Sequence, residues 1–307
     1  MPERADRRFL VLSRAGDKSL HKTWIADSSV ERNWDLQLNA YGKDESRVQD
    51  GDLPTVIDRG TKFDSIARHF RNNPDLLERY DYIAIPDDDL LLSPQAFNRV
   101  FEIATEYDLS VAQPSLSLNS YLSHPIVMNV PGFKLRYSNF VEGMACCFKS
   151  SYLKRLLPLL ENYSTGWGVD LVWTMTMEHP EFRSAVIDEV QVTHTRPMHT
   201  GPLYAQLRRE KRSPKDDVKK LASNFRNAPR AMFVYGGVLA DGREVDGAET
   251  MRRNSAHLLK IAHQSPAWIH AYRFGAVMAV RSVTRSKYLP QTLEPTTAAP
   301  LWLMSLF

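Results

Sequence analysis

The chain has 307 residues, enough for one large or two moderate domains with a buried core. Hydrophobic residues make up 43% and charged residues 24%, as in ordinary soluble globular proteins, and the net charge of +3 does not favour nucleic acid as a partner. No apolar run reaches the roughly 18 residues that a membrane-spanning helix needs.

The cysteines and the N-terminus indicate the compartment. Cys146 and Cys147 are adjacent and cannot join distant segments, so we expect two small core residues and no disulfide framework. The apolar run after Arg8 is too short for a signal peptide and has no small-residue cleavage site. The cytoplasm is therefore the expected location.

The first two thirds of the chain alternate short apolar runs with helical patterns, which is typical of α/β proteins. Thr61 is a predicted helix N-cap, and Ser93-Pro94 begins a further helix. Pro158 is expected to mark a kink or a boundary. The predicted strands are 8–13, 34–42, 81–86, 109–114, 140–148 and 185–197, and another two helices are predicted, over 151–162 and from 166–170 to before 180.

Beyond about residue 205 the pattern changes. Residues 208–220 form a charge run, typical of a solvated helix face or connection, and residues 234–245 predict a hairpin around Asp241-Gly242. Residues 267–285 predict a helix in which Arg273, Arg281 and Arg285 interrupt the apolar positions. Two interpretations stay open for this helix: a packing helix, or a basic amphipathic helix that touches an anionic membrane peripherally.

Three consecutive aspartates, Asp87, Asp88 and Asp89, follow the strand at 81–86. Their mutual repulsion is costly unless a cation or several donors neutralise it. The carboxyl end of a strand is where ligands bind in open α/β sheets. We therefore expect Asp87 and Asp89 to work together on a metal, Mn²⁺ or Mg²⁺, and a nearby hydroxyl, with diphosphate oxygens completing the coordination. The alternative is a solvated acidic turn before the next helix.

Two later features add to this cluster. In the segment GWGVD, the glycines permit close approach of the backbone to a ligand, Trp167 offers a flat face to a sugar ring, and Asp170 is a candidate base for an acceptor hydroxyl. His194 ends an alternating run and is a candidate metal ligand through an imidazole nitrogen. The alternatives are a tight turn with a core tryptophan, and a structural histidine.

These motifs, in this order, resemble glycosyltransferases of the GT-A fold. More narrowly, DYIAIPDDDLL, VAQPSL, FVEGMACCF, GWGVDLVW and VIDEVQVTHTRP are similar to the DUF707 family, a glycosyltransferase-like group of plant and bacterial proteins. The resemblance covers roughly residues 8–200. It implies an α/β, GT-A-like (Rossmann-like) mixed sheet flanked by helices, with a nucleotide-sugar-binding and catalytic domain at 1–205. The patterns beyond about residue 205 predict a mainly helical C-terminal extension with a hairpin at 206–307.

The resemblance also implies roles for individual residues. Asp87 matches the first acid of the DXD motif, which approaches the ribose or base of the donor, and Asp89 matches the metal-ligating acid. His194 matches the late metal-binding histidine. Asp170 resembles the catalytic base of inverting enzymes with a GWG-type turn, although many of these carry a Glu-Asp pair after an extra glycine and this chain has Val169-Asp170.

Further residues are candidates for binding the two substrates. Arg14, Lys62 and Asp88 are candidates for the donor nucleotide, with an exposed helix lysine as the alternative for Lys62. Trp167 and Glu142 are candidates for the acceptor, because a buried carboxylate such as Glu142 is costly without partners.

The expected activity is metal-dependent transfer of a sugar from a nucleotide sugar, a UDP-sugar by analogy with the fold, to a glycan or lipid-linked acceptor with inversion. Two alternatives stay open. A Mg²⁺-dependent nucleotidyltransferase needs a glycine-rich basic loop, of which SRAGDKS is a poor version. A non-catalytic carbohydrate- or nucleotide-binding protein would keep the fold without turnover. Walker A, GxGxxG and HExxH patterns are absent from the sequence, which removes the P-loop, dinucleotide-binding and zincin classes.

Overall fold

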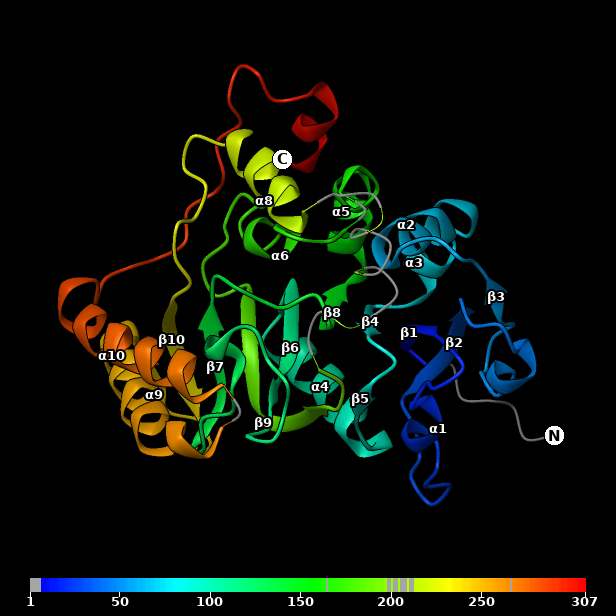
Figure 1. The fold of residues 1–307 in the computed structure, drawn as a ribbon, viewed down its shortest axis with the longest axis horizontal. Helices are drawn as coiled ribbons and strands as arrows, with labels where there is room; N and C mark the ends of the chain where they lie inside the picture. The colour runs from blue at the N-terminus through cyan, green and yellow to red at the C-terminus, as the bar shows by residue number, and fades with distance from the viewer. Residues whose placement is uncertain are drawn as a thin grey trace.

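The computed structural model describes residues 7–163, 165–197, 200, 204, 209, 213–265 and 267–307. An eleven-stranded mixed sheet crosses the molecule, and helices flank it (Figure 1). This confirms the predicted α/β class, the mixed sheet and the helical C-terminal region. The strands are β1 Phe9–Ala15, β2 Trp34–Ala40, β3 Val56–Ile57, β4 Tyr82–Pro86, β5 Leu90–Leu91, β6 Val111–Leu116, β7 Phe133–Ser138, β8 Ala145–Lys149, β9 Ser184–His194, β10 Val234–Leu239 and β11 Glu244–Asp246.

Most of the helices connect or cover these strands. The α-helices are α1 His21–Trp24, α2 Lys62–Asn72, α3 Leu76–Arg79, α4 Pro94–Glu106, α5 Ser150–Asn162, α6 Val169–Val172, α8 Pro214–Ser223, α9 Gly247–Ile261 and α10 Trp268–Thr284. Short 3₁₀ helices are η1 Glu45–Val48, η2 Pro125–Val127, η3 Ala262–Gln264 and η4 Leu301–Leu306. No helix among the described residues is long and apolar enough to cross a membrane.

The strand order places the candidate residues at one edge of the sheet. The order is β11-β10-β7-β9-β6-β8-β4-β1-β2-β3, with β5 paired to β9. Strands β1 to β4 are mutually parallel where they pair, and β8 runs antiparallel to both β4 and β6. Strand β9 is parallel to β6. The carboxyl ends of β1, β4, β6 and β9 therefore meet at the same edge.

Each face of the sheet carries its own hydrophobic core. Phe9 and Val11 of β1 join the cluster that contains Phe97 and Phe101 of α4, whereas Leu10 and Leu12 join the cluster beneath α2 and α5. Alternate side chains of a strand point to opposite faces, so a strand covered on both sides is apolar at nearly every position.

Several local signals act as predicted. The Ser93 hydroxyl accepts a hydrogen bond from the Ala96 amide at the start of α4, and Pro94 occupies the first turn. Thr61 precedes α2. The hairpin β10–β11 turns at Gly242, which has φ of +87°. Cys146 and Cys147 are buried and free.

Other predictions were wrong in their details. The strand predicted at 140–148 begins only at Ala145, because residues 139–144 form a loop that passes the end of β4. Pro158 lies inside α5 and ends no element. In the charge run 208–220, helix α8 begins at Pro214, and residues 208 and 210–212 lie outside the described residues. Strand β7 and helix α9 were not predicted, and β10 pairs with β7, so the hairpin extends the main sheet.

Candidate functional site

The first aspartate after β4, Asp87, is held by a lysine from a neighbouring helix. Its amide donates to the Met144 carbonyl at 2.7 Å. Lys62 Nζ lies 2.5 Å from Asp87 Oδ1 and also donates to the carbonyl oxygens of Ile85 and Gly143. The side chain of Lys62 is only 19% exposed, so the alternative of an exposed helix lysine is wrong. Lys62 and Asp87 lie together at the carboxyl end of β4.

The second aspartate, Asp88, is buried and fully engaged within the protein. Its Oδ2 accepts from the Gly16 amide at 2.7 Å and from the Tyr41 hydroxyl at 3.1 Å. Its Oδ1 accepts from Arg196 Nη1 at 3.0 Å. Asp88 therefore ties the loop after β1 to the loop after β9.

The third aspartate, Asp89, faces the predicted histidine. Pairing of β5 with β9 sets Leu90 opposite His194, so Asp89 Oδ2 lies 3.4 Å from His194 Nε2. The other oxygen, Asp89 Oδ1, is buried and has no hydrogen-bond partner. Burial acts to raise the pKa of Asp89, but His194 and Arg196 outweigh it and leave this pKa below its ordinary value.

The second nitrogen of His194 is anchored by the backbone. His194 Nδ1 lies 2.7 Å from the Tyr121 carbonyl oxygen. This contact assigns the Nδ1 proton to that bond and leaves Nε2 facing Asp89. Burial acts to lower the pKa of His194, but the Asp89 carboxylate acts to raise this pKa and so favours a second proton on Nε2. Loss of that Nε2 proton would free the nitrogen as a metal donor, with Nδ1 anchored as is usual in a metal-binding histidine. Asp87 and Asp89 have separate protein partners, because Asp87 contacts Lys62 and Asp89 contacts His194.

These groups fit a divalent cation. An imidazole nitrogen and a carboxylate with an unpartnered buried oxygen are suitable donors for Mn²⁺ or Mg²⁺. Within the described ranges, no group of three or more His, Cys, Asp or Glu side chains converges on one point. Asp89 and His194 would therefore hold the cation together with oxygens from a ligand or water.

The GWG segment forms a turn that requires both of its glycines. Gly166 and Gly168 have φ of +74° and +87°. A Cβ on Gly166 would overlap the Phe63 ring, and one on Gly168 would lie 3.0 Å from the Val218 Cα. Between them, the Trp167 indole donates from Nε1 to the Tyr204 hydroxyl at 3.1 Å. The prediction of a tight turn is confirmed.

Two acids lie beside this turn: Glu142 is buried and Asp170 is half-buried. Burial raises the pKa of Asp170 to about 7, although backbone amides near Gly168 oppose this rise. Burial, with a smaller effect of the Asp170 charge, raises the pKa of Glu142 to about 8. Glu142 Oε2 has no hydrogen-bond partner. The charges of Asp87, Glu142 and Asp170 all act on the Tyr204 hydroxyl, so one region contains these four groups.

Arg14, which was predicted to bind the donor nucleotide, lies at the base of the site and not in it. Its guanidinium donates to Asn39 Oδ1 and to the carbonyl oxygens of Asp58 and Gly60. These contacts join the ends of β1 and β2 to the loop before α2. Arg14 therefore supports the loop that leads to Lys62.

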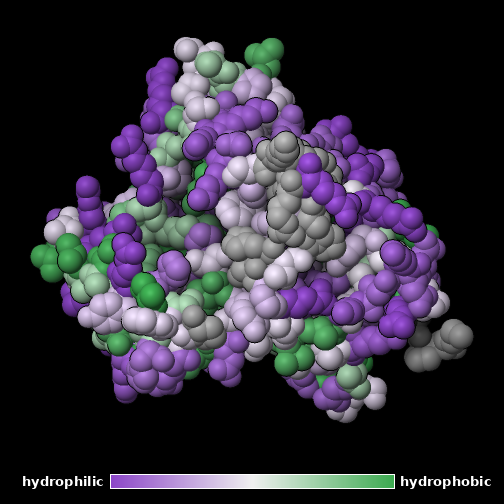
Figure 2. All heavy atoms as spheres, viewed as in Figure 1, coloured by the Kyte–Doolittle hydropathy of each residue, from purple (hydrophilic) through white to green (hydrophobic). Residues whose placement is uncertain are grey.

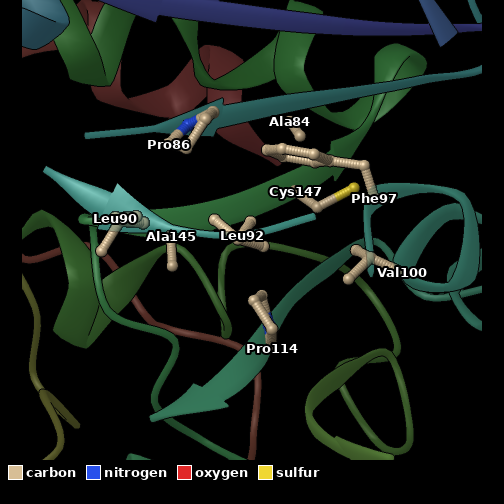
Figure 3. Close-up of a pocket in the computed structure, with 9 residues that line it drawn as sticks. All are labelled: Ala84, Pro86, Leu90, Leu92, Phe97, Val100, Pro114, Ala145 and Cys147. Atoms are coloured by element: carbon tan, nitrogen blue, oxygen red, sulfur yellow. The ribbon is translucent and has the colours of Figure 1, made fainter. Parts of the chain in front are cut away.

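A small cavity behind the aspartates belongs to the core. Its volume is about 10 Å³, room for about one water molecule, and all nine side chains in Figure 3 are apolar. Pro86 and Leu90, which flank the three aspartates, line this cavity with side chains from β6, β8 and α4. The cavity offers no polar group to a ligand, and its walls support the acidic turn from below.

Sequence reasoning missed three polar residues of the site: Tyr41, Arg196 and Tyr204. Arg196 also lies 3.8 Å from Asp89 Oδ2 and donates to the Lys18 carbonyl, so it links both later aspartates to the first loop. Its position two residues after His194 was the available signal. Tyr41 and Tyr204 carry no motif and were found only through their contacts.

Comparison with protein-family models gave no match, and comparison with curated proteins gave none. The resemblance to the DUF707 family therefore stays a prediction.

Proposed function

We propose that the chain is a metal-dependent glycosyltransferase that moves a sugar from a nucleotide sugar, with a UDP-sugar as the expected donor, to a glycan or lipid-linked acceptor with inversion. One observation carries the proposal: Asp89 faces His194 Nε2 while the opposite ring nitrogen is anchored to the Tyr121 carbonyl. A histidine held only for packing has no need of an unpartnered carboxylate oxygen beside it.

The metal and the basic residues have separate tasks in this proposal. Asp89 and His194 would hold a divalent cation, which would supply Lewis-acid stabilisation of a departing diphosphate. Lys62 brings a positive charge to the same sheet edge, where it fixes Asp87 for contact with the donor ribose or base. Arg196 and Tyr41 fix Asp88, so the acidic turn keeps its shape with or without a donor.

Asp170 is the proposed general base. Its pKa of about 7 suits proton abstraction near neutral pH. The acceptor oxygen forms its bond to the anomeric carbon as its proton passes to Asp170, while the bond from that carbon to the diphosphate breaks and the diphosphate keeps the electron pair. Glu142 and Trp167 are the proposed acceptor contacts. Glu142 has an unpartnered buried oxygen that an acceptor hydroxyl can satisfy.

A thermal-shift experiment tests the proposal. Nucleoside diphosphates and nucleotide sugars are added to the full chain, each with Mn²⁺ and with EDTA. We expect one nucleotide to raise the melting temperature only with metal, since a ligand of the folded state stabilises it by mass action. This shift should vanish in Asp89→Ala and His194→Ala but persist in Asp241→Ala, which removes an exposed carboxylate from the distant hairpin.

The result separates the proposed enzyme from its rivals. Metal-dependent binding with sugar transfer or slow donor hydrolysis supports a glycosyltransferase. Binding without any turnover would indicate a non-catalytic binding protein instead. An unchanged shift in Asp89→Ala would remove the metal role of Asp89.

A further inference from the structure

Helix α10 is covered on only one side. Ala271, Gly275 and Met278 are buried, and the helix packs along α9. A Cβ on Gly275 would lie 3.1 Å from the Leu259 side chain, and Ser255 Oγ donates to the Gly275 carbonyl at 2.8 Å. The two helices are therefore in close contact, and α10 presents its opposite side outward.

The outward side of α10 carries an apolar stripe. Ile269, Tyr272, Ala276, Val280 and Val283 follow one another at intervals of three or four residues and are all exposed. Val280 and Val283 are 63% and 79% exposed. Apolar and aromatic side chains in a row on a helix surface are characteristic of an interaction face.

A basic groove runs beside this stripe. Its volume is about 470 Å³, and its charged lining residues are Arg230, Arg273 and Arg281, with His270 alongside. In Figure 2, the surface over α10 mixes hydrophobic and hydrophilic residues and is hollowed beside the helix. No acidic side chain lines the groove among the described residues. Its remaining lining residues are Pro125, Leu171, Pro229, Ala231, Met232, Phe274 and Val277.

The three arginines differ in how they contact the rest of the protein. Arg281 donates to the Met232 carbonyl and lies over the Phe233 ring, so it holds one wall of the groove. In the described part of the chain, neither Arg230 nor Arg273 has an ion-pair partner, and both are exposed. Their charges are thus available to an anion.

The sequence around α10 strengthens the positive charge. Between Glu249 and Glu294 there is no aspartate or glutamate. The same stretch contains seven basic residues: Arg252, Arg253, Lys260, Arg273, Arg281, Arg285 and Lys287. Of these, Arg253 pairs with Glu249. The remaining positive charge beside an apolar stripe complements an anionic membrane surface.

We propose that α10 docks the protein on an anionic lipid bilayer, with the apolar stripe in the interface and the phosphate of a lipid headgroup in the basic groove. A second copy of the chain fits this face poorly, because a two-fold contact would bring the same arginines together. The docking does not depend on the proposed catalytic function.

The groove also borders the helix that carries the candidate base. Leu171 lines it and directly follows Asp170 in α6. A lipid-linked acceptor held in the groove would lie against this helix. This step, unlike the docking, rests on the proposed glycosyltransferase function.

Co-sedimentation with vesicles tests the docking without any activity assay. The full chain is mixed with phosphatidylcholine vesicles, with and without phosphatidylglycerol. We expect binding only with the anionic lipid, and loss of binding at high salt. Arg230→Ala and Arg273→Ala should each lower the partition coefficient about fivefold, the change implied by about 1 kcal/mol for each basic residue at such a surface. Val280→Glu with Val283→Glu should abolish binding.

Matched controls lie at the opposite end of the sheet. Ile57 on β3 is 54% exposed and Arg59 follows it, so Ile57→Glu and Arg59→Ala make the same chemical changes far from α10. We expect both to bind like the unchanged protein. Equal binding to both vesicle types, no binding by folded protein, or equal losses in the controls would each overturn the proposal. A dimer that Val280→Glu dissociates, in protein that ignores vesicles, would assign this face to a second copy instead.

Discussion

Lys62 Nζ and Asp87 Oδ1 lie 2.5 Å apart, and the same ammonium group also donates to the carbonyl oxygens of Ile85 and Gly143. All three donors of the lysine are thus used. One side chain from α2 therefore joins the end of β4 to the loop before β8. The ammonium group of Lys62 cross-links the edge of the sheet that carries the aspartates.

This relationship predicts that Lys62→Met destabilises the fold by about 1–3 kcal/mol, because two carbonyls and a carboxylate lose their donor. Lys154 is the control: it also pairs with a carboxylate, Glu78, but both side chains are more than half exposed. Lys154→Met should cost less than about 1 kcal/mol. Urea unfolding measures both, and equal losses would contradict the bridging role of Lys62.

The raised pKa of Asp170 predicts the pH dependence of transfer. A general base must be deprotonated, so kcat/KM should rise with pH and level off above about pH 7, the pKa of Asp170. Below that pH it should fall about tenfold per unit. The profile is measured with the donor identified by thermal shift. The residual activity of Asp170→Asn should no longer fall below about pH 7. An unchanged fall would show that another residue is the general base.

Glu142 predicts a pH dependence of stability. Its pKa is about 8 in the folded protein against an ordinary 4.5, so the folded state holds the proton more tightly. The contribution to stability is therefore full below about pH 4.5 and is lost as pH rises toward 8. In Glu142→Gln the loss of stability between about pH 5 and about pH 8.5 should be smaller than in the unchanged protein. Equal losses, measured by urea unfolding, would show that Glu142 is not desolvated as described.

Two neighbouring acids on β9 should respond differently to removal. Asp188 pairs with Arg136 at 2.6 Å, with both side chains fully buried, and it also accepts from the Val130 amide. Asp188→Ala should lower the free energy of unfolding by about 3–5 kcal/mol, since it leaves the buried guanidinium of Arg136 without its charge partner. The adjacent Glu189 pairs with Arg99 at the surface, and Glu189→Ala should cost less than about 1 kcal/mol. Denaturant midpoints measure both, and similar values for the two variants would contradict the account.

Two glycines with the same φ of +87° separate backbone strain from close packing. Alanine at Gly242, where nothing lies within 4 Å of a new Cβ, should cost about 1–2 kcal/mol from the left-handed conformation alone. Alanine at Gly168 would also meet the Val218 Cα at 3.0 Å, so we expect a larger loss of stability. Equal losses in thermal unfolding would mean that α8 moves freely to make room.

Much of this protein was predictable from local sequence. The α/β class, the strands that become β1, β2, β4, β6 and β9, the cap at Ser93 and the turn at Gly242 follow from hydrophobic periodicity and from residues with restricted or unusual backbone preferences. The candidate residues Asp89, His194, Glu142 and Asp170 were also selected from sequence, because acids and histidines at strand ends and glycine turns are recognisable by type and position.

The tertiary structure decided how these residues pair. Asp87 and Asp89 are two residues apart, yet one meets Lys62 from α2 and the other meets His194 through the pairing of β5 with β9. Arg196 and Tyr41 enter through contacts with Asp88, and the loop at 139–144 replaces part of a predicted strand because it must pass the end of β4. Periodicity reports which face of an element is buried. It does not report which distant element covers that face, so partners, burial and pKa shifts follow only from the assembled sheet.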